Sequence, residues 1–295
     1  MTRSYAVIAA PPTIPPMLGT RILTAVILVA LVLAALFMLP PLGWGAISLL
    51  VIVAAAAEWA DLAGLRKATW LSFVAGTLLT GVALLLAPSF GFVRGWPDGI
   101  ILAACGTATL FWLFVATPWL ARRWKPESRL AMAVAGWVVL IGAWVAVVEL
   151  QAYSPWLVLA AMAIVWIADT ATYFAGRAFG KHKLAPQVSP GKTWEGVFGA
   201  LGAVAVFALM LAPLAPAGGY SGADSPMAVA VWVAFALGLV ALSIVGDLYE
   251  SLLKRHAGVK DSGRLLPGHG GVLDRLDAML AAMPAAALLA LAYLR

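Results

Sequence analysis

Long apolar runs constrain this chain more than any other feature of its sequence. The stretch 227–246, MAVAVWVAFALGLVALSIVG, has no charged residue, and several other runs are similar. About 20 such residues are needed to cross the hydrocarbon core of a bilayer. Over the whole chain 63% of residues are hydrophobic and 11% are charged, whereas soluble domains have about 25% charged residues. The sequence therefore predicts an integral membrane protein.

The apolar runs, separated by charged or Gly/Pro-rich segments, predict nine membrane-spanning helices. Only helices and closed barrels satisfy the backbone within lipid, and the period-two alternation of barrel strands is absent. We therefore expect an all-α polytopic membrane protein with no sheet. The expected spans are residues 21–39, 44–63, 70–88, 99–117, 130–149, 155–176, 195–213, 227–247 and 276–294.

The domain organisation expected from these spans has three parts. Residues 1–20 form a flexible N-terminal arm, and residues 21–150 form five N-terminal transmembrane helices. Residues 151–295 are expected to form a C-terminal catalytic transmembrane region, because two of its cytoplasmic loops are far richer in charge and histidine than the others. Within that region we expect two cytoplasmic loops, 177–195 and 248–275.

The distribution of Lys and Arg predicts the orientation. With the N-terminus in the cytoplasm, all 19 basic residues except Arg94 and Arg295 fall in cytoplasmic segments, which follows the positive-inside rule. Nine spans then put the C-terminus outside. The net charge of +6 faces anionic lipid head groups and nucleotides. No basic helix or soluble module indicates nucleic-acid binding.

Four carboxylates lie within or at the ends of the expected spans, namely Asp169, Asp247, Asp274 and Asp277. A charge within a span costs a few kcal/mol, which makes each a candidate functional residue. Asp274 and Asp277 share one helix face, where two anions repel unless a cation lies between them. Carboxylates without soft ligands nearby favour Mg²⁺. Ion pairing with Arg275 and other basic residues, or interaction with the helix dipole, is the alternative.

A glycine-rich turn, PGHGG at 267–271, precedes the last span. Glycine-rich turns before helices direct N–H groups at phosphate. The segment 189–196, SPGKTWEG, lacks the spacing of a P-loop. His269 is compatible with a general base, a phosphate ligand or an ordinary loop histidine. Positive charge surrounds the turn through Lys254, Arg255, Lys260 and Arg264.

Together these groups predict phosphoryl or nucleotidyl transfer on a lipid, because metal ions and basic side chains spread the charge of a transferring phosphorus centre. Residue chemistry alone selects neither the nucleotide nor the lipid. A transporter that uses Asp169 and Asp247 as an ion relay is the non-enzymatic alternative. It would predict charges near the bilayer midplane and paired broken helices.

The segment 251–277, SLLKRHAGVKDSGRLLPGHGGVLDRLD, resembles the signature of the phosphatidate cytidylyltransferases, also called CDP-diacylglycerol synthases. It meets every specified position of S-x-x-K-R-x4-K-D-x-G-x2-L-P-x-H-G-G-x2-D-R-x-D. The upstream segments ADTATYFAGRAFGKHKLAP, 168–186, and SPGKTWEG also resemble the family. Gly191 is a departure, because we expect lysine there in many relatives. The specific resemblance covers residues 166–277, and the first five spans match only as generic membrane helices.

The resemblance implies that CTP and phosphatidic acid react to give CDP-diacylglycerol and pyrophosphate, with Mg²⁺ and, as a further candidate, a second cation. It also implies a homodimer in a bacterial inner (cytoplasmic) membrane, with the active site facing the cytoplasm. A CTP-dependent polyprenol or dolichol kinase is the enzymatic alternative, and it would release CDP.

The resemblance also implies roles for individual residues. The expected metal ligands are Asp247, Asp274 and Asp277, with Asp261 as a further candidate. The expected catalytic residues are Asp247, Lys254, Arg255, Lys260, Asp261, His269, Asp274 and Asp277. The expected substrate-binding residues are Asp169, Lys181, Lys183, Ser189, Lys192, Thr193, Ser251, Gly270, Gly271 and Arg275.

Overall fold

The computed structural model describes residues 18–87, 96–125, 128–212, 225–266 and 270–294, and these residues are mostly helical. The N-terminal part contains α1 (Leu18–Met38), α2 (Pro41–Leu62), α3 (Lys67–Leu86), α4 (Asp98–Leu110), the π-helix η1 (Phe111–Ala116), α5 (Thr117–Arg122) and α6 (Arg129–Tyr153). The C-terminal part contains α7 (Pro155–Phe179), β1 (Lys183–Ala185), β2 (Ser189–Thr193), α8 (Trp194–Leu211), α9 (Pro226–Ala257) and α10 (Leu273–Leu294).

Eight helical segments in the described part of the chain are long and apolar enough to cross a membrane, with α4, η1 and α5 counted as one. The chain is thus an all-α polytopic membrane protein, as the sequence predicts. The expected first span, 21–39, corresponds to α1, and the count of nine spans stays a prediction. The expected arm, 1–20, overlaps α1 by three residues, and the rest of it lies outside the described residues.

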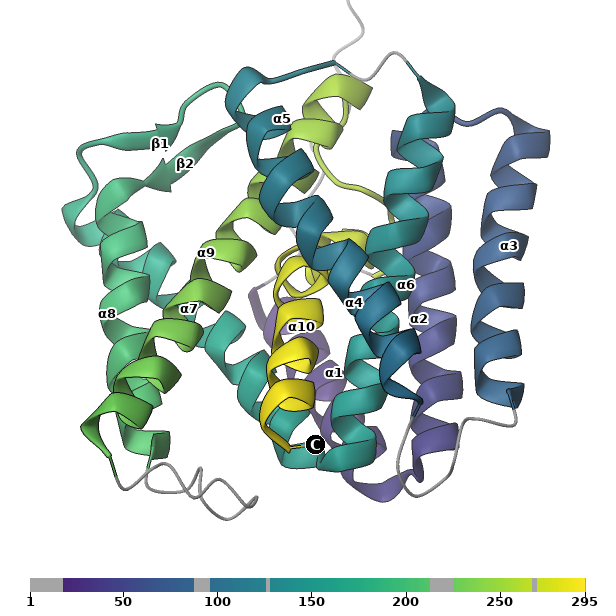
Figure 1. Cartoon of the computed structure of the whole chain (residues 1–295). Coiled ribbons are helices and arrows are strands. Elements are labelled where there is room, and N and C mark those ends of the chain that lie inside the picture. Colours follow the sequence, from purple (N-terminus) through teal and green to yellow (C-terminus); the bar gives the residue numbers. More distant parts are fainter. Residues whose placement is uncertain (1–17, 88–95, 126–127, 213–224, 267–269, 295) are drawn as a thin grey trace, which may run out of the picture.

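The helices alternate in direction, so their connections gather at two ends of the bundle (Figure 1). One end holds the β1–β2 hairpin, the end of α9 and the connections α2–α3 and α5–α6. These are the connections that the distribution of Lys and Arg predicts to be cytoplasmic. Helix α6 lies in the interior and packs against α2, α4 and α10, whereas α8 packs against α7 and α9 at the edge.

The expectation of no sheet was wrong. Strands β1 and β2 form an antiparallel hairpin in which Lys183 faces Thr193. The reasoning failed because it treated the whole chain as if it lay in lipid. The hairpin lies between two spans, where no lipid demands that every backbone group be satisfied within one helix.

The hairpin is held against the end of α9 by a small apolar core. Val188, in the turn between the strands, is buried with Leu248 and Leu252 of α9. Arg255 lies one turn further along α9, and its Nε donates a hydrogen bond to the carbonyl oxygen of Val188 at 3.3 Å. The hairpin is therefore fixed to α9 on the side that carries the charged residues.

Helix α9 is longer than the sequence predicted. The expected span ended at residue 247, but the helix continues to Ala257 and ends at Gly258, whose φ of 71° is left-handed. Residues 248–257 were expected to begin a loop because they are charged. Leu248, Leu252 and Leu253 are nevertheless buried, and their spacing gives this segment an apolar face. The charge is therefore presented on a rigid helix.

Buried tryptophans connect helices that are distant in sequence. The Nε1–H group of Trp59 in α2 donates to the carbonyl oxygen of Met132 in α6 at 2.9 Å. The Nε1–H group of Trp112 in η1 donates to the carbonyl oxygen of Leu280 in α10 at 3.0 Å. In an apolar surrounding an unpaired donor is costly, so these bonds favour one packing of the bundle.

Candidate active site

Three carboxylates from three helices lie within electrostatic reach of one another, and we call them the acidic cluster. They are Asp169 of α7, Asp247 of α9 and Asp277 of α10, and each interacts electrostatically with the other two. Asp169 and Asp247 both lie ten residues before the ends of their helices, which is about 15 Å at 1.5 Å per residue. The cluster therefore lies well below the end of the bundle that carries the hairpin.

Lys192 brings positive charge to the acidic cluster. It comes from β2, and its Nζ lies 2.6 Å from Oδ2 of Asp247. The Ser251 hydroxyl lies one turn further along α9 and donates to Oδ1 of Asp247 at 3.4 Å. The two side chains of the Lys192–Asp247 pair keep 15% and 28% of their surface exposed, and Asp169 is exposed. The cluster therefore places three carboxyl groups beside one ammonium group.

Gly246 allows the two acidic helices to come together. A Cβ at this position would overlap the carbonyl oxygen of Asp277 and lie 2.9 Å from the Cβ of Ala281. Small residues allow membrane helices to approach closely in this way. Asp247, the next residue along α9, is thereby brought near Asp277.

Asp274, the other predicted metal ligand on α10, has a different environment. Its Oδ1 lies 2.6 Å from Nζ of Lys254, which also pairs with Glu250. Its Oδ2 accepts hydrogen bonds from the backbone N–H groups of Ser262 at 2.9 Å and Gly271 at 2.8 Å. Both carboxylate oxygens of Asp274 therefore have protein partners.

The glycine-rich turn makes room for protein carboxylates. Gly270 has a φ of 81°, and a Cβ there would lie 2.7 Å from Oδ2 of Asp274. A Cβ at Gly271 would overlap both the Ser262 hydroxyl and the carboxylate of Glu58. The prediction that Gly270 and Gly271 contact substrate stays untested, but the N–H group of Gly271 is directed at Asp274.

Sequence reasoning missed two buried acids, Glu58 and Glu250, which are 4% and 3% exposed. Glu58 lies in α2 and accepts hydrogen bonds from the segment around the glycine-rich turn. Glu250 pairs with Lys254 and interacts electrostatically with Asp277. The rule that an acid within a span is functional also selects Glu58, but the family resemblance did not extend to that part of the chain.

Thr193 and Ser189 lie on β2, at the edge of the site. Thr193 is buried, and its hydroxyl oxygen caps α8 by accepting a hydrogen bond from the N–H group of Gly196 at 3.2 Å. Ser189 is half-buried at the start of the strand. Gly191 has open space around its Cβ position, so the lysine expected there in relatives would fit.

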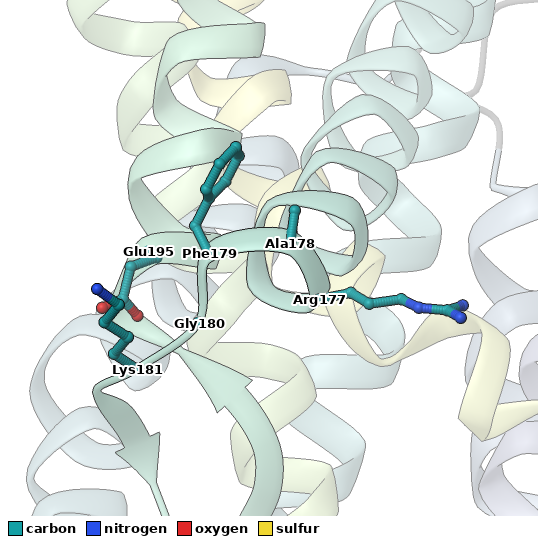
Figure 2. Close-up of a pocket in the computed structure, with 6 residues that line it drawn as sticks. All are labelled: Arg177, Ala178, Phe179, Gly180, Lys181 and Glu195. Carbon is teal, nitrogen blue, oxygen red and sulfur yellow. The ribbon is translucent and has the colours of Figure 1, made fainter.

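Lys181 lies at an open pocket of about 480 Å³ beside the hairpin. Figure 2 shows its side chain next to that of Glu195, while Arg177 points away from both. Glu195 also accepts hydrogen bonds from the backbone N–H group of His182 and lies 2.7 Å from its ring Nδ1. The pocket is lined by no member of the acidic cluster, so Lys181 belongs to a separate place on the surface.

The other predicted residues lie nearer the surface. Lys183, Arg255, Lys260, Asp261 and Arg275 are exposed. His269 lies outside the described residues, so its predicted role stays untested.

The oxygen donors of the acidic cluster fit Mg²⁺ chemically, because Mg²⁺ prefers hard carboxylate ligands. Within the described residues, no three Asp, Glu, His or Cys side chains are arranged to hold one ion together. Mg²⁺ is commonly held by one or two carboxylates, with water and substrate phosphate completing its coordination. Asp247 and Asp277 are suited to that mode of binding.

The fold and the site define a polytopic membrane enzyme whose polar centre lies among transmembrane helices. The sequence profile of the cytidylyltransferase family matches residues 19–293, so the chain belongs to this family of nucleotidyltransferases. The match includes the N-terminal helices, where the signature-based resemblance was only generic.

Curated relatives agree with this assignment. The chain is 36% identical over 287 residues to the phosphatidate cytidylyltransferase of Haemophilus influenzae, with 91% of this chain and 96% of the relative covered. It is 38% identical over 276 residues to that of Pseudomonas aeruginosa, with 91% and 95% covered. A Staphylococcus aureus phosphatidate cytidylyltransferase is 46% identical over 127 residues, which are 43% of this chain and 46% of the relative.

Proposed function

We propose that the chain transfers the cytidylyl group of CTP to phosphatidic acid, forming CDP-diacylglycerol and pyrophosphate for phospholipid biosynthesis. The observation that carries the proposal is the acidic cluster, with Lys192 beside it, in a chain whose relatives of nearly equal length are named phosphatidate cytidylyltransferases. Its position among transmembrane helices suits a reaction between a water-soluble nucleotide and a membrane lipid.

The proposed reaction is one in-line displacement at phosphorus. A phosphate oxygen of phosphatidic acid forms a bond to the α-phosphorus of CTP. The bond from the α-phosphorus to the oxygen bridging the β-phosphorus breaks, and its electron pair leaves with pyrophosphate. The nucleophile is already an anion, so it needs little deprotonation. The principal barrier is repulsion between two polyanions, which fixed positive charge lowers.

The basic residues of the site are suited to that task. Lys192 lies in the site itself, paired with Asp247. Arg255 and Lys260 are exposed near the end of α9, where they can attract the triphosphate. Lys254 pairs with Glu250 and Asp274, so we assign it to holding α9 and α10 together.

Mg²⁺ is part of the proposal, held by Asp247 and Asp277 with Asp169 beside them. When bound, it neutralises phosphate charge and stabilises the leaving pyrophosphate. Asp274, which was also predicted as a ligand, orders the turn before α10 through its two N–H contacts. Asp169, Asp247 and Asp277 outnumber the one ammonium group beside them, and a divalent cation would balance the remaining carboxylate charge.

The proposal includes an orientation and an assembly. The N-terminus and the hairpin face the cytoplasm of a bacterial inner membrane, nine helices span it, and two copies form a homodimer. The predicted cytoplasmic connections gather at one end of the bundle (Figure 1), which supports the orientation. CTP then enters from the cytoplasm, and phosphatidic acid enters from the bilayer.

The test follows the phosphorus atoms of CTP. Purified protein in detergent is given phosphatidic acid, Mg²⁺ and CTP labelled at either the α- or the γ-phosphorus. We expect the α-label in the lipid and the γ-label in pyrophosphate. A γ-label in the lipid, with CDP released, would instead indicate a lipid kinase. Absence of transfer, together with ion uptake into vesicles, would indicate the transporter alternative.

A further inference from the structure

Glu58 is a buried carboxylate of the N-terminal half that contacts the catalytic half. It lies in the last turns of α2 and is 4% exposed. Its Oε2 accepts hydrogen bonds from the Ser262 hydroxyl at 2.8 Å and from the N–H group of Leu273 at 2.8 Å. Its Oε1 accepts one from the N–H group of Val272 at 3.0 Å. All three donors belong to the segment that leads into α10.

Two of these donors are backbone groups at the start of α10. The first N–H groups of a helix have no partner within the helix, and the helix dipole favours an anion beside them. Such caps commonly come from a side chain next to the helix in sequence. Here the acceptor is more than 200 residues away along the chain. The capping of α10 at its N-terminal end therefore depends on a residue of α2.

Two neighbouring glycines leave the space that the Glu58 carboxylate occupies. A Cβ at Gly263 would overlap one oxygen of Glu58, and a Cβ at Gly271 would overlap the other. Both glycines belong to the 251–277 signature. The signature segment therefore holds a protein carboxylate at this point.

Glu58 is connected to the acidic cluster through Ser262 and Asp274. The Ser262 hydroxyl that donates to Glu58 also accepts a hydrogen bond from the N–H group of Asp274 at 3.2 Å. The N–H group of Ser262 donates to the Asp274 carboxylate at 2.9 Å. Asp277 lies one turn beyond Asp274 on the same helix. The contacts of Glu58 thus fix the first turn of the helix that carries Asp277.

We propose that Glu58 is a positioning residue: from α2 it fixes the start and rotation of α10, so that Asp277 faces Asp247. Only the expected effect of Glu58 on the reaction rate rests on the proposed cytidylyl transfer. The effect on α10 itself is independent of which reaction the protein catalyses.

The test uses Glu58→Gln, which preserves side-chain size but replaces one oxygen with an N–H₂ group facing backbone donors. We expect kcat for cytidylyl transfer to fall about 10-fold or more, with KM for CTP and phosphatidic acid within about threefold. Amide hydrogen exchange at Val272 and Leu273 should become faster, while exchange in α6 stays unchanged. Glu58→Asp keeps two oxygens on a shorter side chain and should recover part of the rate.

The control is Glu149→Gln. Glu149 is also a buried glutamate of the N-terminal half. It lies near the C-terminal end of α6 and accepts a hydrogen bond from the N–H group of Trp96 at 3.0 Å. We expect it to leave exchange at Val272 and Leu273 unchanged. Unchanged exchange there in Glu58→Gln, or the same exchange pattern in both variants, would overturn the inference. If the wild type transfers no cytidylyl group, the proposed function fails, and the exchange comparison still decides the role of Glu58.

Discussion

Two groups of carboxylates lie close together in this protein, and they differ in what holds them. Glu58 and Asp274 accept hydrogen bonds from the backbone of the turn before α10. Asp169, Asp247 and Asp277 interact electrostatically with one another. Asp247 also pairs with Lys192 and accepts a hydrogen bond from Ser251, and Asp277 accepts one from the N–H group of Ala278. The first group is satisfied by the protein itself. The second brings three carboxyl groups together beside one ammonium group.

Under the proposed function, this difference separates acids that support the fold from acids that bind the cation. A buried carboxylate with full hydrogen bonding stabilises its surroundings, whereas like charges that face each other destabilise them. Proteins keep such local conflicts mainly at functional sites. Under the proposed function, the acidic cluster is the place where a cation and phosphate bind, and the turn before α10 supports it.

The largest expected effect comes from Asp277→Asn. We expect cytidylyl transfer to fall about 100-fold or more, equivalent to about 2.7 kcal/mol of transition-state stabilisation. The thermal midpoint should stay the same or rise, because an acid that faces two other acids is replaced by a neutral amide of the same size. Rates with CTP and phosphatidic acid and thermal unfolding in detergent measure the two effects.

Asp274→Asn is the matched control from the satisfied group. It should lower the thermal midpoint, because Lys254 and the N–H groups of Ser262 and Gly271 lose a charged partner, and hydrogen bonds to charged groups contribute about 1.5–3 kcal/mol each. If Asp277→Asn kept full Mg²⁺-dependent activity, or destabilised the protein as Asp274→Asn does, the comparison between the two groups would not hold.

An intermediate effect is expected for Gly246→Ala. The added Cβ would overlap the carbonyl oxygen of Asp277, so α9 and α10 must move apart. We expect a loss of about 1–3 kcal/mol of stability and about 10-fold lower activity. The control is Gly238→Ala, on the same helix but with open space around the added Cβ. It should retain the stability and the activity of the wild type. Equal behaviour of the two variants would contradict the role of Gly246.

The smallest effect is expected for Thr193→Ala. The loss of the α8 cap should cost about 1 kcal/mol and change kcat by no more than about threefold. Thr193→Asn restores a capping group without the hydroxyl and should recover the stability. A rise in KM for CTP of more than about 10-fold in both variants would show instead that the hydroxyl contacts the nucleotide, as the sequence analysis expected.

Much of the fold was predictable because the physics of a bilayer acts on local sequence. The apolar runs gave the positions of the spans to within a few residues at most ends. The errors lie where the chain leaves lipid. Charge on 248–257 was taken to mean a loop, but the apolar face around Leu252 extends the helix, and the hairpin at 183–193 forms in the same region.

The site was only partly predictable. The sequence analysis selected Asp169, Asp247 and Asp277 because a charge within a membrane span costs free energy and so marks a candidate functional residue. Glu58 meets the same rule, yet its partners are more than 200 residues away, and spacing along a chain gives no sign of such a contact. The roles of the glycines were also hidden, because a turn that accommodates a protein carboxylate has the same sequence as one that accommodates a phosphate.

By itself, the sequence determined that the chain is a membrane protein and approximately where its helices run, because both follow from local hydrophobicity and charge. Only the tertiary structure decided which acids face one another and which are capped by the backbone. Those outcomes depend on close approaches such as that at Gly246 and on contacts between distant helices. No local pattern encodes them, because the distance between two side chains on different helices is set by the packing of the whole bundle.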